Sequence, residues 1–152
     1  MRFLSLLAVL FLVAGCDSDG DAPVLDDEFY VGTWTLSSIS DGGGDRTADV
    51  SQSLDGLTIE FESDGGFALD ADFSDAVNAS GQADLRTTGT YQARAETPSL
   101  FLTSGGVSAL FTANAVSEDR VSLTAPGLIV GVVLAGLPFE FEGDTTITVQ
   151  RR

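Results

Sequence analysis

The sequence predicts an all-β domain, an antiparallel up-and-down barrel of about eight strands. From Phe29 onward, apolar and polar residues alternate with a period of two, which is typical of strands with one buried face. Clusters of Gly, Asp, Ser and Asn divide the alternation into short segments, and their short connections favour sequential hairpins. Closing such a meander into a barrel removes its exposed edges. A two-sheet β-sandwich has the same alternation and is the alternative fold.

The expected strands follow one another along the chain with turns of a few residues. The clearest hairpin joins 57–62 to 67–73 through Ser63-Asp64-Gly65-Gly66. The segment 128–137 does not alternate, so it predicts either a doubly buried strand or a short helix that plugs or caps the barrel. The full set of expected strands is 33–39, 57–62, 67–73, 85–93, 99–103, 109–115, 120–124, 139–142 and 145–151.

The composition argues against several classes of function. The 152 residues include 7 Lys or Arg, 23 Asp or Glu and no His, which gives a net charge of −16. Nucleic acid is an improbable partner because its binding needs a basic surface. Without His, and with one Cys, the chain lacks the usual ligands of a transition metal and the base of a Ser-His or Cys-His nucleophile. We therefore expect no metal, no cofactor and no catalytic residue, and we do not expect an enzyme.

Two pairs of carboxylates are candidates for acid–base catalysis, because paired carboxylates hydrolyse glycosides in many enzymes. Glu60 and Glu62 lie on one predicted strand, and Glu140 and Glu142 lie on another. Alternate residues on the outer face of a strand are usually solvated charges, and neither pair accompanies a nucleophile motif. We interpret both pairs as surface charge.

The N-terminus is typical of an export signal. A short positive region, Met1-Arg2, precedes the apolar run 3–14, which is shorter than the roughly 20 residues that a membrane-spanning helix needs. The next residues, Val13-Ala14-Gly15-Cys16, resemble the lipobox of bacterial lipoproteins, in which the chain is cut before the cysteine and its thiol is diacylated.

The lipobox resemblance implies a division of the chain and a location. Residues 1–15 are the expected signal peptide, 16–28 the lipidated Cys16 with an acidic tether, and 29–152 the barrel domain. Two or three acyl chains, such as palmitate, give a stable anchor, so we expect a membrane-anchored protein of the bacterial cell envelope. An Asp directly after the cysteine resembles an inner-membrane retention signal, whereas an acidic cluster there resembles a surface-export signal. Both the periplasmic and the cell-surface side therefore stay open.

A second resemblance begins at the first predicted strand. Gly32-Thr33-Trp34, after the acidic turn Asp26-Asp27-Glu28, resembles the Gly-x-Trp motif that opens the barrel of lipocalins and lipocalin-like proteins. In that family the Trp closes one end of the barrel and packs under an Arg near the last strand. By parity, Arg151 lies on the same face as Ile147 and Val149, so it reaches the interior if they do.

A third segment adds to the lipocalin resemblance. Gly89-Thr90-Tyr91 resembles a Gly-Thr-Tyr strand of small bacterial lipocalin-like lipoproteins, so that the resemblance extends over 29–152. It implies a barrel that binds a small apolar or amphipathic molecule. The expected cavity wall is Ile59, Phe61, Phe67, Leu69, Phe73, Tyr91, Leu100, Leu102, Phe111, Leu123, Phe139 and Phe141.

The same side chains allow a second interpretation. In a barrel of eight strands they can fill the interior completely and leave no space for a ligand. The chain would then be a structural or interaction protein of the envelope, with the barrel as its scaffold. The sequence identifies neither a protein partner nor an oligomeric state.

Overall fold

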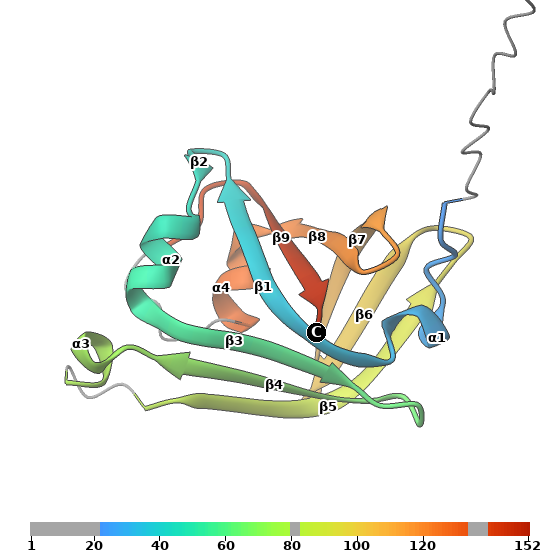
Figure 1. Ribbon diagram of the computed structural model, residues 1–152, viewed down its shortest axis with the longest axis horizontal. Coiled ribbons are helices and arrows are strands. Elements are labelled where there is room, and N and C mark those ends of the chain that lie inside the picture. The colour runs from blue at the N-terminus through green and yellow to red at the C-terminus, as the bar shows by residue number, and fades with distance from the viewer. Residues whose placement is uncertain (1–21, 80–82, 134–139) are drawn as a thin grey trace, which may run out of the picture.

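The computed structural model of the chain describes residues 22–79, 83–133 and 140–152. Eight strands form a closed antiparallel barrel in which each strand pairs with the next along the chain (Figure 1). The first barrel strand also pairs with the last, in a register that runs from Trp34 opposite Arg151 to Ser40 opposite Thr146. This closing pair confirms the predicted barrel. The alternative β-sandwich is wrong, because its two sheets would not be joined at this edge.

The barrel strands agree with most of the segments that alternation predicts. A ninth, two-residue strand, β2 (Gly44–Asp45), forms a short hairpin with the end of β1 (Gly32–Asp41). The barrel strands are β1 (Gly32–Asp41), β3 (Leu54–Phe61), β4 (Gly66–Phe73), β5 (Leu85–Arg94), β6 (Ser99–Ser104), β7 (Val107–Ser117), β8 (Arg120–Pro126) and β9 (Asp144–Arg151).

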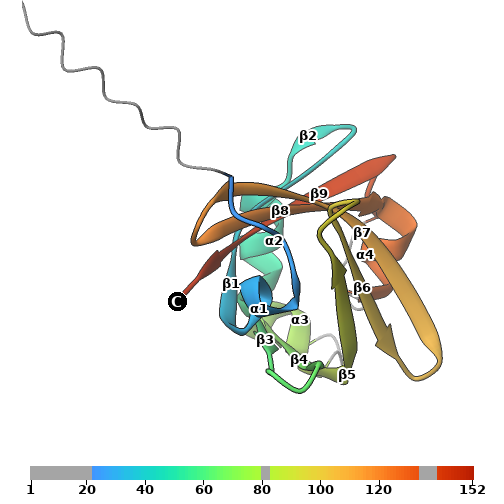
Figure 2. The same ribbon diagram turned by 90° about the vertical axis from the view of Figure 1, so that its right-hand side faces the viewer.

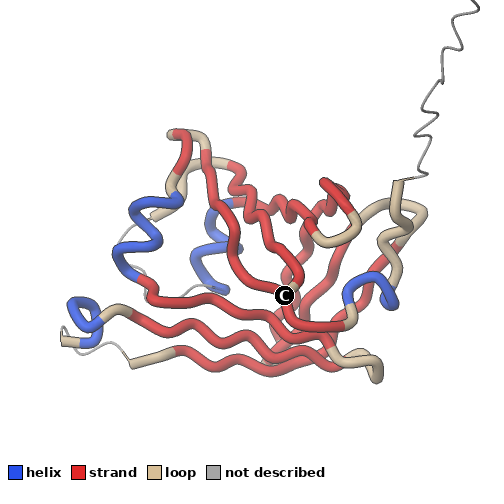
Figure 3. The backbone as a smooth tube through the Cα atoms, in the orientation of Figure 1, coloured by secondary structure: helices blue, strands red, loops and turns tan. Residues whose placement is uncertain are grey.

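Short helices lie at the two ends of the barrel, where Figure 3 shows them in blue. Helix α1 (Asp27–Tyr30) precedes β1 at one end, which faces the viewer in Figure 2. Helices α2 (Thr47–Ser53), α3 (Asp75–Asn78) and α4 (Gly127–Val133) gather at the opposite end (Figure 1). None of the helices in the described ranges combines the length and the apolar character that crossing a membrane requires.

Helix α4 settles the alternative left open for the non-alternating segment. Residues 128–133 are helical, as the capping-helix interpretation predicts, and 134–137 lie outside the described residues. Glycine stands at the first position of the helix because the chain is crowded there. A Cβ at this position would lie 2.8 Å from the backbone oxygen of Phe141 and 2.9 Å from that of Gly143.

The predicted strand at 139–142 is wrong where the structure describes it. Residues 140–142 form a loop, and Phe139 lies outside the described residues. The backbone oxygen of Glu142 accepts a hydrogen bond from the N–H of Gly42 (2.7 Å). The backbone N–H of Glu142 donates to a carboxylate oxygen of Asp41 (3.1 Å). These partners at the end of β1 occupy the backbone groups that a strand ladder would need.

The packed domain begins before the boundary at residue 29 that the sequence predicts. Leu25, inside the expected tether, is 5% exposed and belongs to the hydrophobic core. Asp26 then caps α1, because its carboxylate accepts a hydrogen bond from the N–H of Phe29 (2.9 Å). The acidic residues that resemble a solvated tether therefore include a helix cap.

Candidate functional site

The two ends of the barrel are built differently, and the end at α1 is closed. The indole of Trp34 is completely buried, and its N–H donates a hydrogen bond to the backbone oxygen of Tyr30 (2.6 Å). The guanidinium carbon of Arg151 lies 4.8 Å from the centroid of the Trp34 ring and 5.5 Å from that of Phe29. The guanidinium also donates to the backbone oxygen of Phe29. Stacked rings and a cation thus cover the interior at this end.

Hydrogen bonds fix α1 to the neighbouring strands. The Tyr91 hydroxyl lies 3.1 Å from the backbone oxygen of Asp27 and 3.2 Å from that of Glu62. The Asp27 carboxylate accepts a hydrogen bond from the N–H of Ala93 (2.6 Å). Gly32, with a φ of +126°, supplies the left-handed turn between α1 and β1. The motif residues Gly32, Trp34 and Arg151 therefore build a plug.

Tyr30 in this plug makes the stability pH-dependent. Its side chain is completely buried, and its hydroxyl has no hydrogen-bond partner among the described residues. Burial raises the pKa of this hydroxyl above its ordinary value of 10.0. The Tyr30 hydroxyl therefore ionises at a lower pH in the unfolded chain than in the folded chain. The neutral hydroxyl contributes its full stability below the pKa of the unfolded chain. This contribution is lost as the pH rises from that pKa toward the higher pKa of the folded chain.

Replacing Tyr30 by Phe is expected to stabilise the protein. Removing an unsatisfied buried hydroxyl should raise the free energy of unfolding by about 1–3 kcal/mol at neutral pH. Y30F should also lose less stability than the wild type between about pH 9 and pH 11, whereas Tyr91 titrates in both proteins. Urea unfolding across that range measures both effects. Identical pH profiles for the two proteins would contradict the prediction.

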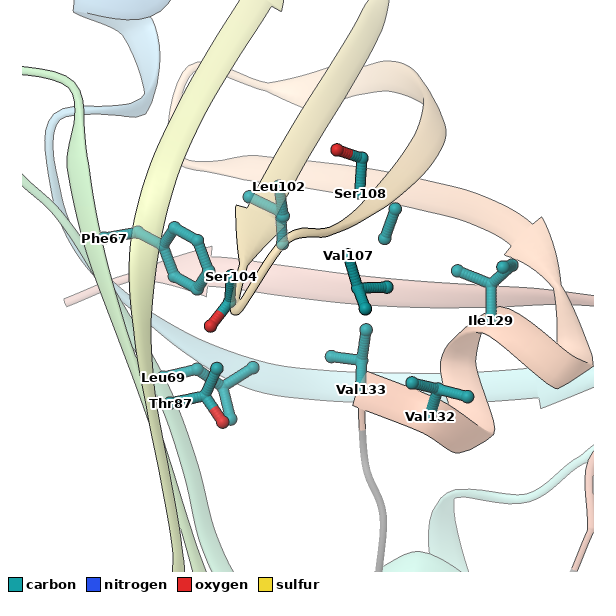
Figure 4. Close-up of a pocket in the computed structure, with 11 residues that line it drawn as sticks. Phe67, Leu69, Thr87, Leu102, Ser104, Val107, Ser108, Ile129, Val132 and Val133 are labelled. Carbon is teal, nitrogen blue, oxygen red and sulfur yellow. The ribbon is translucent and has the colours of Figure 1, made fainter.

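An apolar cavity of about 260 Å³ lies at the opposite end of the barrel. Figure 4 shows Phe67 and Leu69 on one side of it and three side chains of α4 on the other. The apolar lining consists of Phe67, Leu69, Leu102, Val107, Ala109, Ile129, Val132 and Val133. Three hydroxyl residues complete the lining, namely Thr87, Ser104 and Ser108. Among the residues that the structure describes, no charged side chain lines this cavity.

The cavity arises because β6 ends early beside a longer β5. The ladder between these strands runs from Arg94 opposite Ser99 to Thr90 opposite Thr103. The first half of β5, residues 85–89, continues past the end of β6 and pairs only with β4. Helix α4 stands beside this gap and supplies the remaining wall.

Glycine permits the close contact at the edge of the gap. A Cβ on Gly89 would overlap the backbone oxygen of Thr103 and lie 2.8 Å from a ring carbon of Phe67. Only glycine therefore allows the end of β6 to approach β5 this closely beside the Phe67 ring.

The structure places only part of the predicted wall at the cavity. Phe67, Leu69 and Leu102 line the cavity. Phe141 is half-buried against the core, and Phe139 lies outside the described residues. The other predicted side chains are buried in the packed core away from the cavity, namely Ile59, Phe61, Phe73, Tyr91, Leu100, Phe111 and Leu123.

Sequence reasoning missed the part of the wall that α4 provides. Ile129, Val132 and Val133 lie three and four residues apart, the spacing of one helix face. That spacing is visible within the non-alternating segment and is the signal that could have located them. Val107 follows Gly105-Gly106 in the turn after β6, and no sequence pattern marks it as a lining residue.

Cys16 lies outside the described residues. Within the described part of the chain, no group of three or more His, Cys, Asp or Glu side chains could hold a metal ion. The carboxylates of Glu60, Glu62, Glu140 and Glu142 are exposed.

No protein-family model matches the chain. A comparison with curated proteins gives no significant match.

Proposed function

We propose that this barrel binds a small apolar or amphipathic molecule in the cavity beside α4. The supporting observation is an apolar space of about 260 Å³ in a barrel whose interior is otherwise packed. An apolar cavity of about 150 Å³ accommodates benzene, so this one has room for a larger hydrocarbon. Apolar walls with a few hydroxyl groups are the usual composition of a small-molecule site.

Two exposed valines indicate where the ligand would enter. Val107 and Val132 line the cavity, yet they are 60% and 57% exposed. Apolar side chains that connect solvent to an apolar cavity form a natural entrance for a molecule that leaves water. The plug of Trp34 and Arg151 leaves no such route at the opposite end.

We further propose that the chain is a lipoprotein of the bacterial envelope, anchored through Cys16. The support is the lipobox resemblance together with the apolar run before it. Leu25 and α1 pack at the closed end of the barrel, so a tether from Cys16 would leave from there. The cavity entrance would then face away from the anchoring membrane.

The anchor has a direct test. Cys16→Ala should abolish the incorporation of labelled palmitate and release the protein from the membrane fraction of expressing bacteria, because no thiol remains to be acylated. Cys16→Ala protein that still carries the label and sediments with membranes would contradict the anchor.

The binding proposal is tested with a matched pair of variants in α4. Val132 lines the cavity, whereas Leu128 on the same helix is 79% exposed and does not. An aspartate at Val132 would place an unpaired charge against the apolar ligand and lose hydration when the ligand binds, so V132D should weaken binding by about tenfold or more. L128D should bind as the wild type does. Titrating the purified full-length proteins with the uncharged dye Nile red measures the affinities.

The outcome separates the two interpretations of the barrel. Loss of binding in V132D alone supports the cavity. Absence of saturable binding in the wild type, or equal binding by both variants, would reject it and favour a structural or interaction protein of the envelope. The large share of the predicted wall that is buried in packed core is the observation behind that second candidate.

A further inference from the structure

The polar groups that line the cavity are all hydroxyls, and two of the three already take part in hydrogen bonds within the barrel. The Ser104 hydroxyl donates to the backbone oxygen of Thr88 (2.7 Å). The Ser108 hydroxyl shares a hydrogen bond of 2.9 Å with the hydroxyl of Thr103. A hydroxyl that donates its hydrogen still has acceptor capacity. The lining therefore suits a ligand whose head group donates hydrogen bonds.

Within the described residues, no cation at this end of the barrel is left without a carboxylate beside it to pair with an anionic ligand. Its two arginines within the described residues already lie beside carboxylates. Arg46 is 3.4 Å from Asp49 and 3.8 Å from Asp41, and Arg86 on the outer face is 3.5 Å from Asp70. Arg94, Arg120, Arg151 and Arg152 stand at the end of the barrel where α1 lies.

Carboxylates outnumber cations at this end of the barrel. Strand ends and loops at this end carry Asp41, Asp45, Asp72, Asp84, Glu142 and Asp144, in a chain whose net charge is −16. Their field repels an anion before it arrives, and an unpaired carboxylate that entered the apolar lining would lose its hydration without compensation.

We propose that the cavity selects uncharged amphiphiles with a hydrogen-bond-donating head group, such as medium-chain alcohols, and rejects fatty-acid anions. This specificity rests on the proposed binding function. It follows from a lining without charge, hydroxyls with acceptor capacity, and arginines that are engaged elsewhere.

The test compares two ligands that share a chain and differ in the head group. 1-Decanol and decanoate are titrated at pH 8 into full-length protein with labelled valine methyl groups. The signals of Val132 and Val133 report the cavity, and those of Val116, an exposed residue on β7, report non-specific contact. Decanol should bind at least about tenfold more tightly than decanoate. Molar salt should shrink the difference without abolishing it, because it screens the distant carboxylates but supplies no partner in the lining.

A second pair of variants separates charge from shape. V132K places an ammonium group in the wall and should create decanoate binding at the cavity, whereas L128K adds the same charge outside it and should not. Equal or tighter binding of decanoate by the wild type would overturn the specificity and leave the binding function intact. Failure of both ligands to shift Val132 and Val133 would reject the binding function itself.

Discussion

Replacing Gly89 by alanine is expected to destabilise the barrel by about 3 kcal/mol. The new Cβ would overlap the oxygen of the Thr103 carbonyl and lie 2.9 Å from its carbon. That carbonyl cannot move freely, because Thr103 pairs with Thr90 on β5 and with Ser108 on β7. The methyl group also meets Phe67, so the clash has to be relieved by displacing backbone and cavity wall together.

The matched control for Gly89→Ala has the opposite expected sign. Gly131 lies in α4, and a Cβ there would meet none of the described residues within 4 Å outside its own helical turn. Alanine at a helical position should stabilise by about 0.5–1 kcal/mol relative to glycine. Urea unfolding of G89A, G131A and the wild type gives both values. A midpoint for G89A at or above that of the wild type would contradict the proposed close approach of β5 and β6.

Replacing Trp34 by alanine is expected to destabilise the domain by about 3–5 kcal/mol. The substitution removes a completely buried indole and leaves the backbone oxygen of Tyr30 without its donor. It also removes the ring over which the Arg151 guanidinium lies at 4.8 Å. The loss opens the closed end of the barrel, since Phe29 and Tyr30 pack against the same indole.

A double-mutant cycle separates the Trp34–Arg151 contact from the loss of volume. Trp34→Leu and Arg151→Met are compared singly and together by urea unfolding. We expect a coupling free energy of about 0.5–2 kcal/mol, the range for a cation over an aromatic ring at increasing burial. Strictly additive effects would show that Arg151 contributes only through its hydrogen bond to Phe29. A loss below about 1 kcal/mol for W34A would contradict the structural role of the plug.

Local pattern explains why most strands could be predicted. Residues 57–61 and 67–73 alternate, and the glycines and Asp64 between them favour a tight turn, so this hairpin is decided within about 20 residues of sequence. The same parity places Arg151 on the inner face of β9, where it lies over Trp34 although 117 positions separate the two residues. Alternation transmits this information because a strand turns every second side chain to the same face.

The error at 139–142 shows where local pattern fails. Phe139-Glu140-Phe141-Glu142 alternates perfectly, yet residues 140–142 form a loop. The Asp41 carboxylate and the Gly42 N–H take the hydrogen-bonding groups of Glu142. Alternation indicates which side chains prefer burial. A strand also needs a neighbouring strand to accept and donate its backbone hydrogen bonds, and the residues at the end of β1 do not form one here.

The sequence by itself therefore determined the antiparallel β class and the inward faces of the strands, because both depend on side-chain parity and turn chemistry along the chain. The lipocalin resemblance supplied Gly32, Trp34 and Arg151, and the pairing of β1 with β9 decided for the barrel over the sandwich. Only the tertiary structure decided which apolar residues meet ligand space. Phe67 lines the cavity and Phe61 does not, although both alternate in the same hairpin. The difference depends on where β6 stops beside β5 and where α4 comes to stand. Both are long-range packing outcomes, set by contacts between segments that no local pattern couples.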